Sequence, residues 1–197
     1  MLEINKVYLG DCLDLMRDIP DKSIDCVITD PPYPDMFASE YNYFDGIIDF
    51  LNDIHCRQFV FWTAKCEFPL DYSAIHIWDK KCGVGSMYEK IFERNGSKNY
   101  SVFRHYLINS IVSASYTGDT FENHPSQKPV ALIKELINKH TKPDDLILDP
   151  FMGSGTTCVA CKLTGRRYIG IEKNEHYIKI ARDSINDTIP NKRLFKE

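Results

Sequence analysis

Short apolar segments typical of strands alternate with amphipathic segments typical of helices along almost the whole chain. The strand-like segments are 6–9, 24–29, 58–63, 74–78, 146–148 and 167–171, and 99–115 can supply one or two more. Apolar residues at helical spacing predict helices over 11–19, 43–54, 129–140, 156–163 and 174–185. Parallel strands need such crossover helices, so the alternation predicts an α/β fold with a mostly parallel sheet covered on both faces. In these sheets ligands bind outside the carboxyl ends of the strands.

Size and composition fit one soluble domain. The chain has 197 residues, 43% of them hydrophobic, and no apolar run approaches the ~20 residues of a membrane span. Residues 1–20 contain acids and lack an apolar core, so we expect no secretory signal. The seven cysteines are an odd, scattered set, which indicates reduced thiols and a cytoplasmic location. The net charge of −4 argues against generic nucleic-acid binding by charge alone, although a local basic patch remains compatible with it.

The strand over 24–29 runs directly into Asp30-Pro31-Pro32-Tyr33. The prolines lack the N–H that a sheet ladder needs, so the segment leaves the sheet. Taken alone, it is a proline-rich turn.

Two more predicted strands end in residues that are suited to binding a ligand. The segment 146–148 leads into Asp149-Pro150-Phe151, and Gly153-Ser154-Gly155 then opens a helix. Glycines let a backbone approach a ligand closely, and no lysine follows them as it would in a phosphate-binding P-loop. Glu172 ends the next strand, where an acid can accept both hydroxyls of a ribose. Each feature alone is also compatible with a tight turn or a surface acid.

Together these motifs resemble the amino-group DNA methyltransferases, S-adenosylmethionine enzymes that modify adenine N6 or cytosine N4. The matching stretches are Asp30-Pro31-Pro32-Tyr33, Asp149 to Thr157, His124-Pro125-x-Gln127-Lys128-Pro129 and Gly10-Asp11. The tetrapeptide precedes the glycine loop, as in the beta subgroup, and the resemblance covers residues 4 to about 185.

The resemblance implies one Rossmann-like methyltransferase domain with a seven-stranded, mostly parallel sheet. The catalytic half would cover 1–94, a short target-recognition segment 95–123, and the cofactor-binding half 124–190. Glu172 would hold the cofactor's ribose, Asp11 its adenine amino group, and Phe151, Gly153 and Gly155 its methionine part. Lys128 is a candidate for the cofactor carboxylate, or else an exposed lysine at a helix start. The loop match implies further cofactor-binding positions at Asp149, Ser154 and Thr156.

The tetrapeptide would be catalytic. The Asp30 carboxylate can accept one hydrogen of an exocyclic amino group and the Pro31 carbonyl the other, so that the nitrogen lone pair points at the methyl group. Pro32 would keep the segment rigid, and Tyr33 offers a face for a flipped base. Within the family this tetrapeptide accompanies adenine N6 more often than cytosine N4, so adenine is the favoured target and cytosine the alternative.

Target recognition is the open question, because 95–123 is short for a segment that reads several base pairs. Specificity can be relaxed, a second subunit such as that of a homodimer can add surface, or the segments 34–43 and 80–98 can do the reading. Lys80 and Lys81, beside Gly83 and Gly85, resemble a stretch near DNA in relatives, which makes them candidates for phosphate contacts. The alternative is a solvated charged face.

Cys158 and Cys161 have metal-ligand spacing, yet no second pair exists, so they are expected to be core residues of a helix and no metal is required.

The competing functions are RNA methylation, protein methylation and a catalytically silent DNA-binding subunit. The sequence leaves open whether such an enzyme serves a restriction-modification system, a phage or a regulatory pathway.

Overall fold

One sheet runs through the computed structural model, which describes residues 2–20, 22–33, 41–81, 87–106 and 127–189. Its order is β1-β8-β7-β2-β3-β5-β4-β6. The strands are β1 (Lys6–Leu9), β2 (Cys26–Thr29), β3 (Arg57–Trp62), β4 (Ala74–Asp79), β5 (Tyr88–Arg94), β6 (Val102–Arg104), β7 (Leu146–Asp149) and β8 (Arg167–Glu172). Only β5 is antiparallel to its neighbours, β3 and β4. The mostly parallel sheet is confirmed, with eight strands in the described part of the chain instead of seven.

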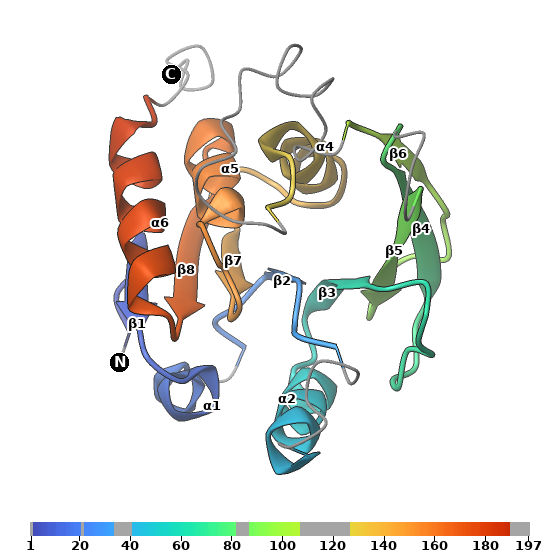
Figure 1. Ribbon diagram of the computed structural model, residues 1–197, viewed down its shortest axis with the longest axis horizontal. Helices are drawn as coiled ribbons and strands as arrows, with labels where there is room; N and C mark the ends of the chain where they lie inside the picture. Colours follow the sequence, from blue (N-terminus) through green and yellow to red (C-terminus); the bar gives the residue numbers. More distant parts are fainter. Residues whose placement is uncertain (1, 21, 34–40, 82–86, 107–126, 190–197) are drawn as a thin grey trace.

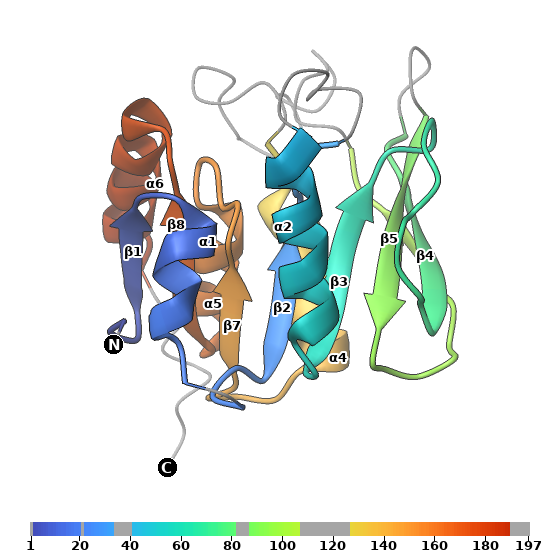
Figure 2. The ribbon, with the colours of Figure 1, turned by 90° about the horizontal axis from the view of Figure 1, so that it is seen from below.

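Helices cover both faces of the sheet, as expected from the sequence (Figures 1 and 2). Helices α4 (Val130–His140), α5 (Thr156–Thr164) and α6 (Glu175–Asp187) lie on one face. Helices α1 (Cys12–Leu15), followed by the 3-10 turn Met16–Asp18, and α2 (Tyr41–Asp53) lie on the other. Asn174 caps α6, since its side chain accepts hydrogen bonds from the N–H groups of His176 and Tyr177. Within the described ranges, no helix combines the length and apolarity that crossing a bilayer demands.

The core has two layers because alternate residues of each strand point to opposite faces. In β3, Phe59 and Phe61 pack with the α4–α5–α6 layer, while Val60 and Trp62 pack with α1 and α2. All four side chains are at most 1% exposed. Such strands read as continuous apolar runs, which explains why the sequence predicts β2, β3 and β7 well.

Strand β5 is not among the strands expected from the sequence. It lies inside the basic segment 80–98, and its sequence YEKIFER carries charges at 89, 90, 93 and 94. These charges suggest a surface, but Glu93 and Arg94 are buried. Partners that are distant in sequence compensate for this burial, and local pattern cannot reveal them.

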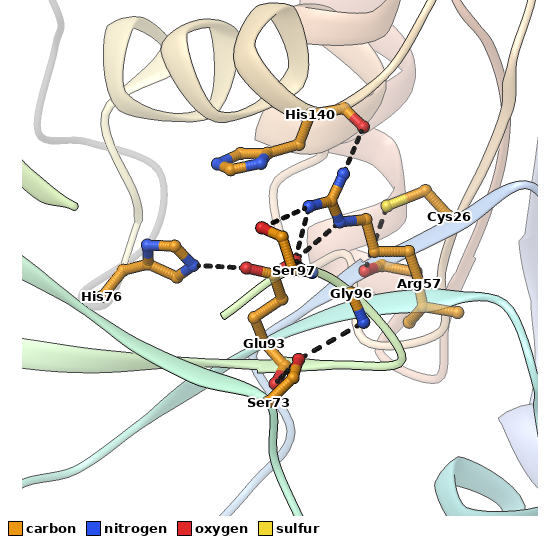
Figure 3. A network of polar contacts seen from close by, with 9 residues as sticks. Cys26, Arg57, Ser73, His76, Glu93, Gly96, Ser97 and His140 are labelled. Carbon is orange, nitrogen blue, oxygen red and sulfur yellow. Dashed lines mark hydrogen bonds and ion pairs between the residues drawn. The ribbon is translucent and has the colours of Figure 1, made fainter. Parts of the chain in front are cut away.

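Glu93 is the centre of a buried polar network (Figure 3). Its Oε2 lies 2.9 Å from His76 Nε2, and its Oε1 accepts hydrogen bonds from Arg57 Nε at 2.7 Å and the Ser97 N–H at 3.0 Å. Arg57 also donates to the main-chain oxygen of His140 at 3.2 Å, so the network joins β3, β4, β5 and the end of α4. Every buried carboxylate oxygen of Glu93 therefore has partners, which is what a charge in a core requires.

Candidate active site

The three strand ends that the sequence singles out meet at one edge of the sheet. Strands β8, β7 and β2 are adjacent and parallel, so their carboxyl ends lie side by side. A cleft of about 630 Å³ opens there. Its lining includes these predicted site residues: Asp30, Pro31, Pro32, Tyr33, Lys128, Asp149, Phe151, Gly153, Ser154, Thr156 and Glu172. The fold thus brings the predicted catalytic and cofactor-binding segments into one cavity.

The Asp30 carboxylate is held through both of its oxygens. Tyr33 donates its hydroxyl to Asp30 Oδ1 at 2.7 Å, and Lys128 donates from Nζ to Oδ2 at 2.5 Å. The Tyr33 ring in turn packs edge-on against Trp62, with ring centroids 5.4 Å apart. Asp30 therefore has a defined orientation toward the cleft before any ligand is bound.

Lys128 and Glu89 form a charged cluster behind Asp30. The Lys128 side chain is only 10% exposed, and its Nζ lies 3.4 Å from Glu89 Oε2 as well as against Asp30. Burial would lower the pKa of Lys128, but Asp30 and Glu89 outweigh it and raise that pKa. Lys80 binds the other oxygen of Glu89 at 2.6 Å. Burial favours a raised pKa for Glu89, yet the ammonium groups of Lys128 and Lys80 lower it.

Glu89 is a site residue that the sequence gives no reason to choose. It lies in the unexpected strand β5, and its two lysine partners come from other segments of the chain. The only local signal would have been an acid beside apolar strand residues, which is equally typical of a surface.

The glycine loop and Glu172 also contribute to the lining of the cleft. Gly153 and Gly155 have φ angles of 52° and 84°, in the left-handed region that favours glycine. A Cβ on Gly155 would lie 2.8 Å from Ala181 Cβ, so the loop also needs glycine for space. Glu172 Oε2 accepts the Gly153 N–H at 3.0 Å and Oε1 accepts the Asn174 N–H at 2.8 Å. Backbone groups thus fix the Glu172 carboxylate at the cleft edge.

Asp149 is a buried carboxyl group at the end of β7. Burial raises its pKa to about 7, although the Thr157 hydroxyl and the Phe151 N–H donate to it and act in the opposite direction. The Phe151 N–H lies 3.2 Å from Asp149 Oδ1. Asp149 therefore supports the turn that carries Phe151 into the cleft.

Asp11 lies at the same sheet edge, because Leu9 of β1 is in register with Glu172. Its Oδ1 accepts the Leu13 N–H at 2.8 Å and caps α1. Asp11 is not part of the lining of the cleft, and its contact with an adenine amino group stays a prediction.

The two candidate DNA-binding lysines have different environments. The Lys80 side chain is 8% exposed and paired with Glu89, and its ammonium lies 5.2 Å from the centroid of the Trp78 ring. A phosphate contact would require Lys80 to leave that pair. Lys81 is exposed, so only Lys81 presents its charge outward in this structure. DNA contact by these lysines stays a prediction.

Cys158 and Cys161 are both buried in α5, as core residues behind the glycine loop. Within residues 2–20, 22–33, 41–81, 87–106 and 127–189, no group of three or more His, Cys, Asp or Glu side chains could hold a metal ion.

Comparison with known proteins identifies the family. A family model described as DNA methylase, covering N6 and N4 methyltransferases, matches residues 57–183. The chain belongs to this DNA methylase family. The match includes both the glycine loop and Glu172, and it favours DNA methylation over the RNA, protein and non-catalytic alternatives.

Relatives of this DNA methylase span nearly all of the chain. DNA adenine methyltransferase YhdJ of Escherichia coli is 28% identical across 91% of this chain and 82% of its own length. That alignment extends over 248 positions, more than the 197 residues of this chain, so YhdJ has residues without a counterpart here.

Solved structures share the fold. The cytosine-N4-specific PvuII DNA methyltransferase superposes with a TM-score of 0.72 at 17% identity, over 96% of this chain and 89% of that one. The DNA modification methylase TTHA0409 of Thermus thermophilus, in complex with S-adenosyl-L-methionine, superposes with a TM-score of 0.63 at 19% identity, over 94% and 96% of the two chains. The methyltransferase fold expected from the motifs is therefore confirmed.

Proposed function

We propose that this DNA methylase transfers the methyl group of S-adenosyl-L-methionine to the exocyclic amino group of a flipped base, with adenine N6 as the target. The observation that carries the proposal is that Asp30 and Tyr33 line the same cleft as Gly153, Ser154 and Glu172. A nucleophile-orienting carboxylate and a ribose-binding carboxylate are the two groups that this reaction needs, and hydrogen bonds orient both here.

The cleft fits the cofactor. A nucleoside with a charged amino-acid tail needs a close backbone approach, an acceptor pair for its ribose and an apolar surface. The left-handed glycines, Glu172 and Phe151 meet these needs, and Asp11 at the neighbouring strand end would accept from the cofactor's adenine. Ser154, Thr156 and Asp149 line the same cleft. When bound, S-adenosyl-L-methionine supplies a methyl group on a sulfonium sulfur, which keeps the electron pair of the bond that breaks.

The chain's own residues prepare the amino nitrogen. Its lone pair is delocalised into the base ring, so it is a poor nucleophile in the planar form. Asp30 accepts one amino hydrogen and the Pro31 carbonyl accepts the other, which favours a pyramidal nitrogen with its lone pair directed at the methyl carbon. After transfer the nitrogen carries an extra proton, and the Asp30 carboxylate is placed to accept it. Tyr33 supplies the stacking surface.

Adenine is the proposed base because the tetrapeptide begins with Asp. The 28% identity to an adenine methyltransferase over most of both chains supports this assignment. The high structural similarity to a cytosine-N4 enzyme concerns the fold that both groups share.

We infer a division of labour along the chain. Residues 1–94 form the catalytic half and 124–190 the cofactor-binding half, with target recognition assigned to 95–123. Part of that segment is strand β6 of the sheet, and residues 107–123 lie outside the described residues. Because this segment offers little surface for reading DNA, we infer that a second copy in a homodimer adds to it. Lys81 is the proposed phosphate contact.

The proposal is tested by supplying tritium-labelled cofactor and unmethylated duplex DNA, followed by nucleoside analysis of the product. Label in N6-methyladenosine is the expected result. Label in N4-methylcytosine would overturn the choice of base, and DNA without label would overturn the function.

A further inference from the structure

We propose that Lys128 and Glu89 form a switch that frees Asp30 for the target amino group: the ammonium of Lys128 moves from Asp30 to Glu89 when the base enters. This inference rests on the proposed methyl transfer and assigns two positioning residues to it. Neither would touch the methyl group, and both would act through Asp30.

The first observation is that the catalytic acceptor is already in use. Each oxygen of Asp30 accepts a hydrogen bond, one from Tyr33 and one from Lys128. An amino group that is to donate to Asp30 must share an oxygen with one of them or displace it. Displacing Lys128 has the larger electrostatic consequence, because its ammonium neutralises the charge on which Asp30 depends as an acceptor.

The second observation is an acceptor that Lys128 engages only loosely. Glu89 Oε1 is bound by Lys80 at 2.6 Å, whereas the buried Glu89 Oε2 makes no well-formed hydrogen bond within the described residues. A buried carboxylate oxygen in this state costs free energy. Oε2 lies 3.4 Å from Lys128 Nζ, so a shift of under about 1 Å would complete a charge-assisted hydrogen bond of ~2.8 Å.

The surroundings allow this movement to be short and to stay within the protein. The Lys128 ammonium lies 5.3 Å from the centroid of the Phe61 ring and 6.0 Å from that of Trp78. An aromatic ring attracts a cation over its whole face, so these two rings stabilise the Lys128 ammonium both beside Asp30 and beside Glu89. Lys80 holds Glu89 in place while Lys128 moves.

The charges explain the benefit. In the resting cluster two ammonium groups balance the two carboxylates of Asp30 and Glu89. Once Lys128 has moved toward Glu89, the Asp30 oxygen that it occupied is open to accept from the base. The amino nitrogen becomes positive as it receives the methyl group, and a carboxylate that accepts directly from that nitrogen stabilises the developing charge.

The test is a double-mutant cycle in single-turnover transfer of the tritiated methyl group to unmethylated duplex DNA. Glu89→Gln keeps the shape of residue 89 but removes the charge that draws Lys128 away, so the rate is expected to fall at least about tenfold. In a Lys128→Met background no ammonium has to leave Asp30, and Glu89→Gln is expected to change the rate by less than about threefold. Glu135→Gln, which alters an exposed pair with His105, is the matched control.

The results of this cycle distinguish a failure of the switch from a failure of the proposed function. Equal losses from Glu89→Gln in both backgrounds would mean that Glu89 has a merely structural role and would overturn the switch. A Lys128→Met protein without measurable transfer would also overturn it, because the switch does not need the ammonium for transfer itself. Calorimetry with S-adenosylhomocysteine shows whether each variant still folds and binds, and the Glu89→Gln protein is expected to keep an affinity within about threefold of the unmodified protein. If the unmodified protein labels no DNA, the function fails and the switch fails with it.

Discussion

At the scale of single residues, the two carboxylates of the cleft are held in different ways. Glu172 accepts two backbone N–H groups, which cannot leave without a change in the loop. Asp30 accepts from the side chains of Tyr33 and Lys128, which can rotate away. This contrast suits a rigid binding residue and an adjustable catalytic one.

Replacing Glu172 by alanine removes the proposed acceptor for the ribose hydroxyls. Two charge-assisted hydrogen bonds would be lost, so we expect affinity for S-adenosylhomocysteine to fall at least about tenfold in calorimetry. Glu175→Ala, in the exposed first turn of α6, is the control. An unchanged affinity of the Glu172 variant would reject the ribose role.

The sequence identifies Asp30 and Glu172 because each stands at the end of an apolar strand within a recognisable motif. It does not identify Glu89, and the cofactor-carboxylate role that it suggests for Lys128 stays a prediction. The pairing of Lys128 with Asp30 and Glu89 joins segments far apart in the chain, so it depends on the tertiary structure.

At the scale of elements, the helices and most strands follow from apolar periodicity, and β5 does not. Its buried Glu93 is compatible with a strand because β3 and β4 bring Arg57 and His76 to it, and the main-chain oxygen of His140 at the end of α4 accepts from Arg57 (Figure 3). Glu89 lies at the start of the same strand and pairs with Lys128 of the cleft lining, so one unpredicted element carries both a structural and a proposed functional carboxylate.

Glu93→Ala would leave His76, Arg57 and the Ser97 N–H without their common acceptor. Removing one partner of a buried charged network typically costs about 3–5 kcal/mol, and we expect a loss of that size in the free energy of unfolding measured with urea. Glu135→Ala, which breaks a more exposed pair, should cost less than about 1 kcal/mol. A similar, small loss in both variants would show that the Glu93 network does not stabilise the sheet.

At the scale of the whole molecule, strand alternation predicts a doubly covered, mostly parallel sheet, and the structure has one. The order of the strands beyond β3 could not be predicted, since it depends on the antiparallel insertion of β5. The sheet also gives the molecule a pH dependence, because it buries His76 beside His140.

Stability should fall on the acid side because of these histidines. Burial lowers the pKa of His76, and it lowers that of His140 from 6.5 to about 4. Between these values the unfolded chain binds more protons, so stability is lost as the pH falls from 6.5 toward 4. Asp149 acts in the opposite direction, since its raised pKa of about 7 gives stability that is lost as the pH rises toward that value.

The substitution His140→Phe separates the contribution of His140 to the pH dependence from that of Asp149. The ring nitrogen Nε2 of His140 has no hydrogen-bond partner within the described residues, so phenylalanine removes the titration at little cost in bonding. Between pH 7 and pH 5 the unmodified protein should lose on the order of 1 kcal/mol more unfolding free energy than this variant. Parallel pH profiles for the two proteins would show that His140 does not titrate as inferred.

The central claim is that Asp30 carries out amino-group methylation of DNA, and single-turnover methyl transfer by Asp30→Ala tests it most directly. We predict that transfer falls at least about 100-fold, while affinity for S-adenosylhomocysteine stays within about tenfold and the exposed control Asp14→Ala behaves as the unmodified protein does. An Asp30→Ala protein that methylates DNA at a near-normal rate would contradict the account.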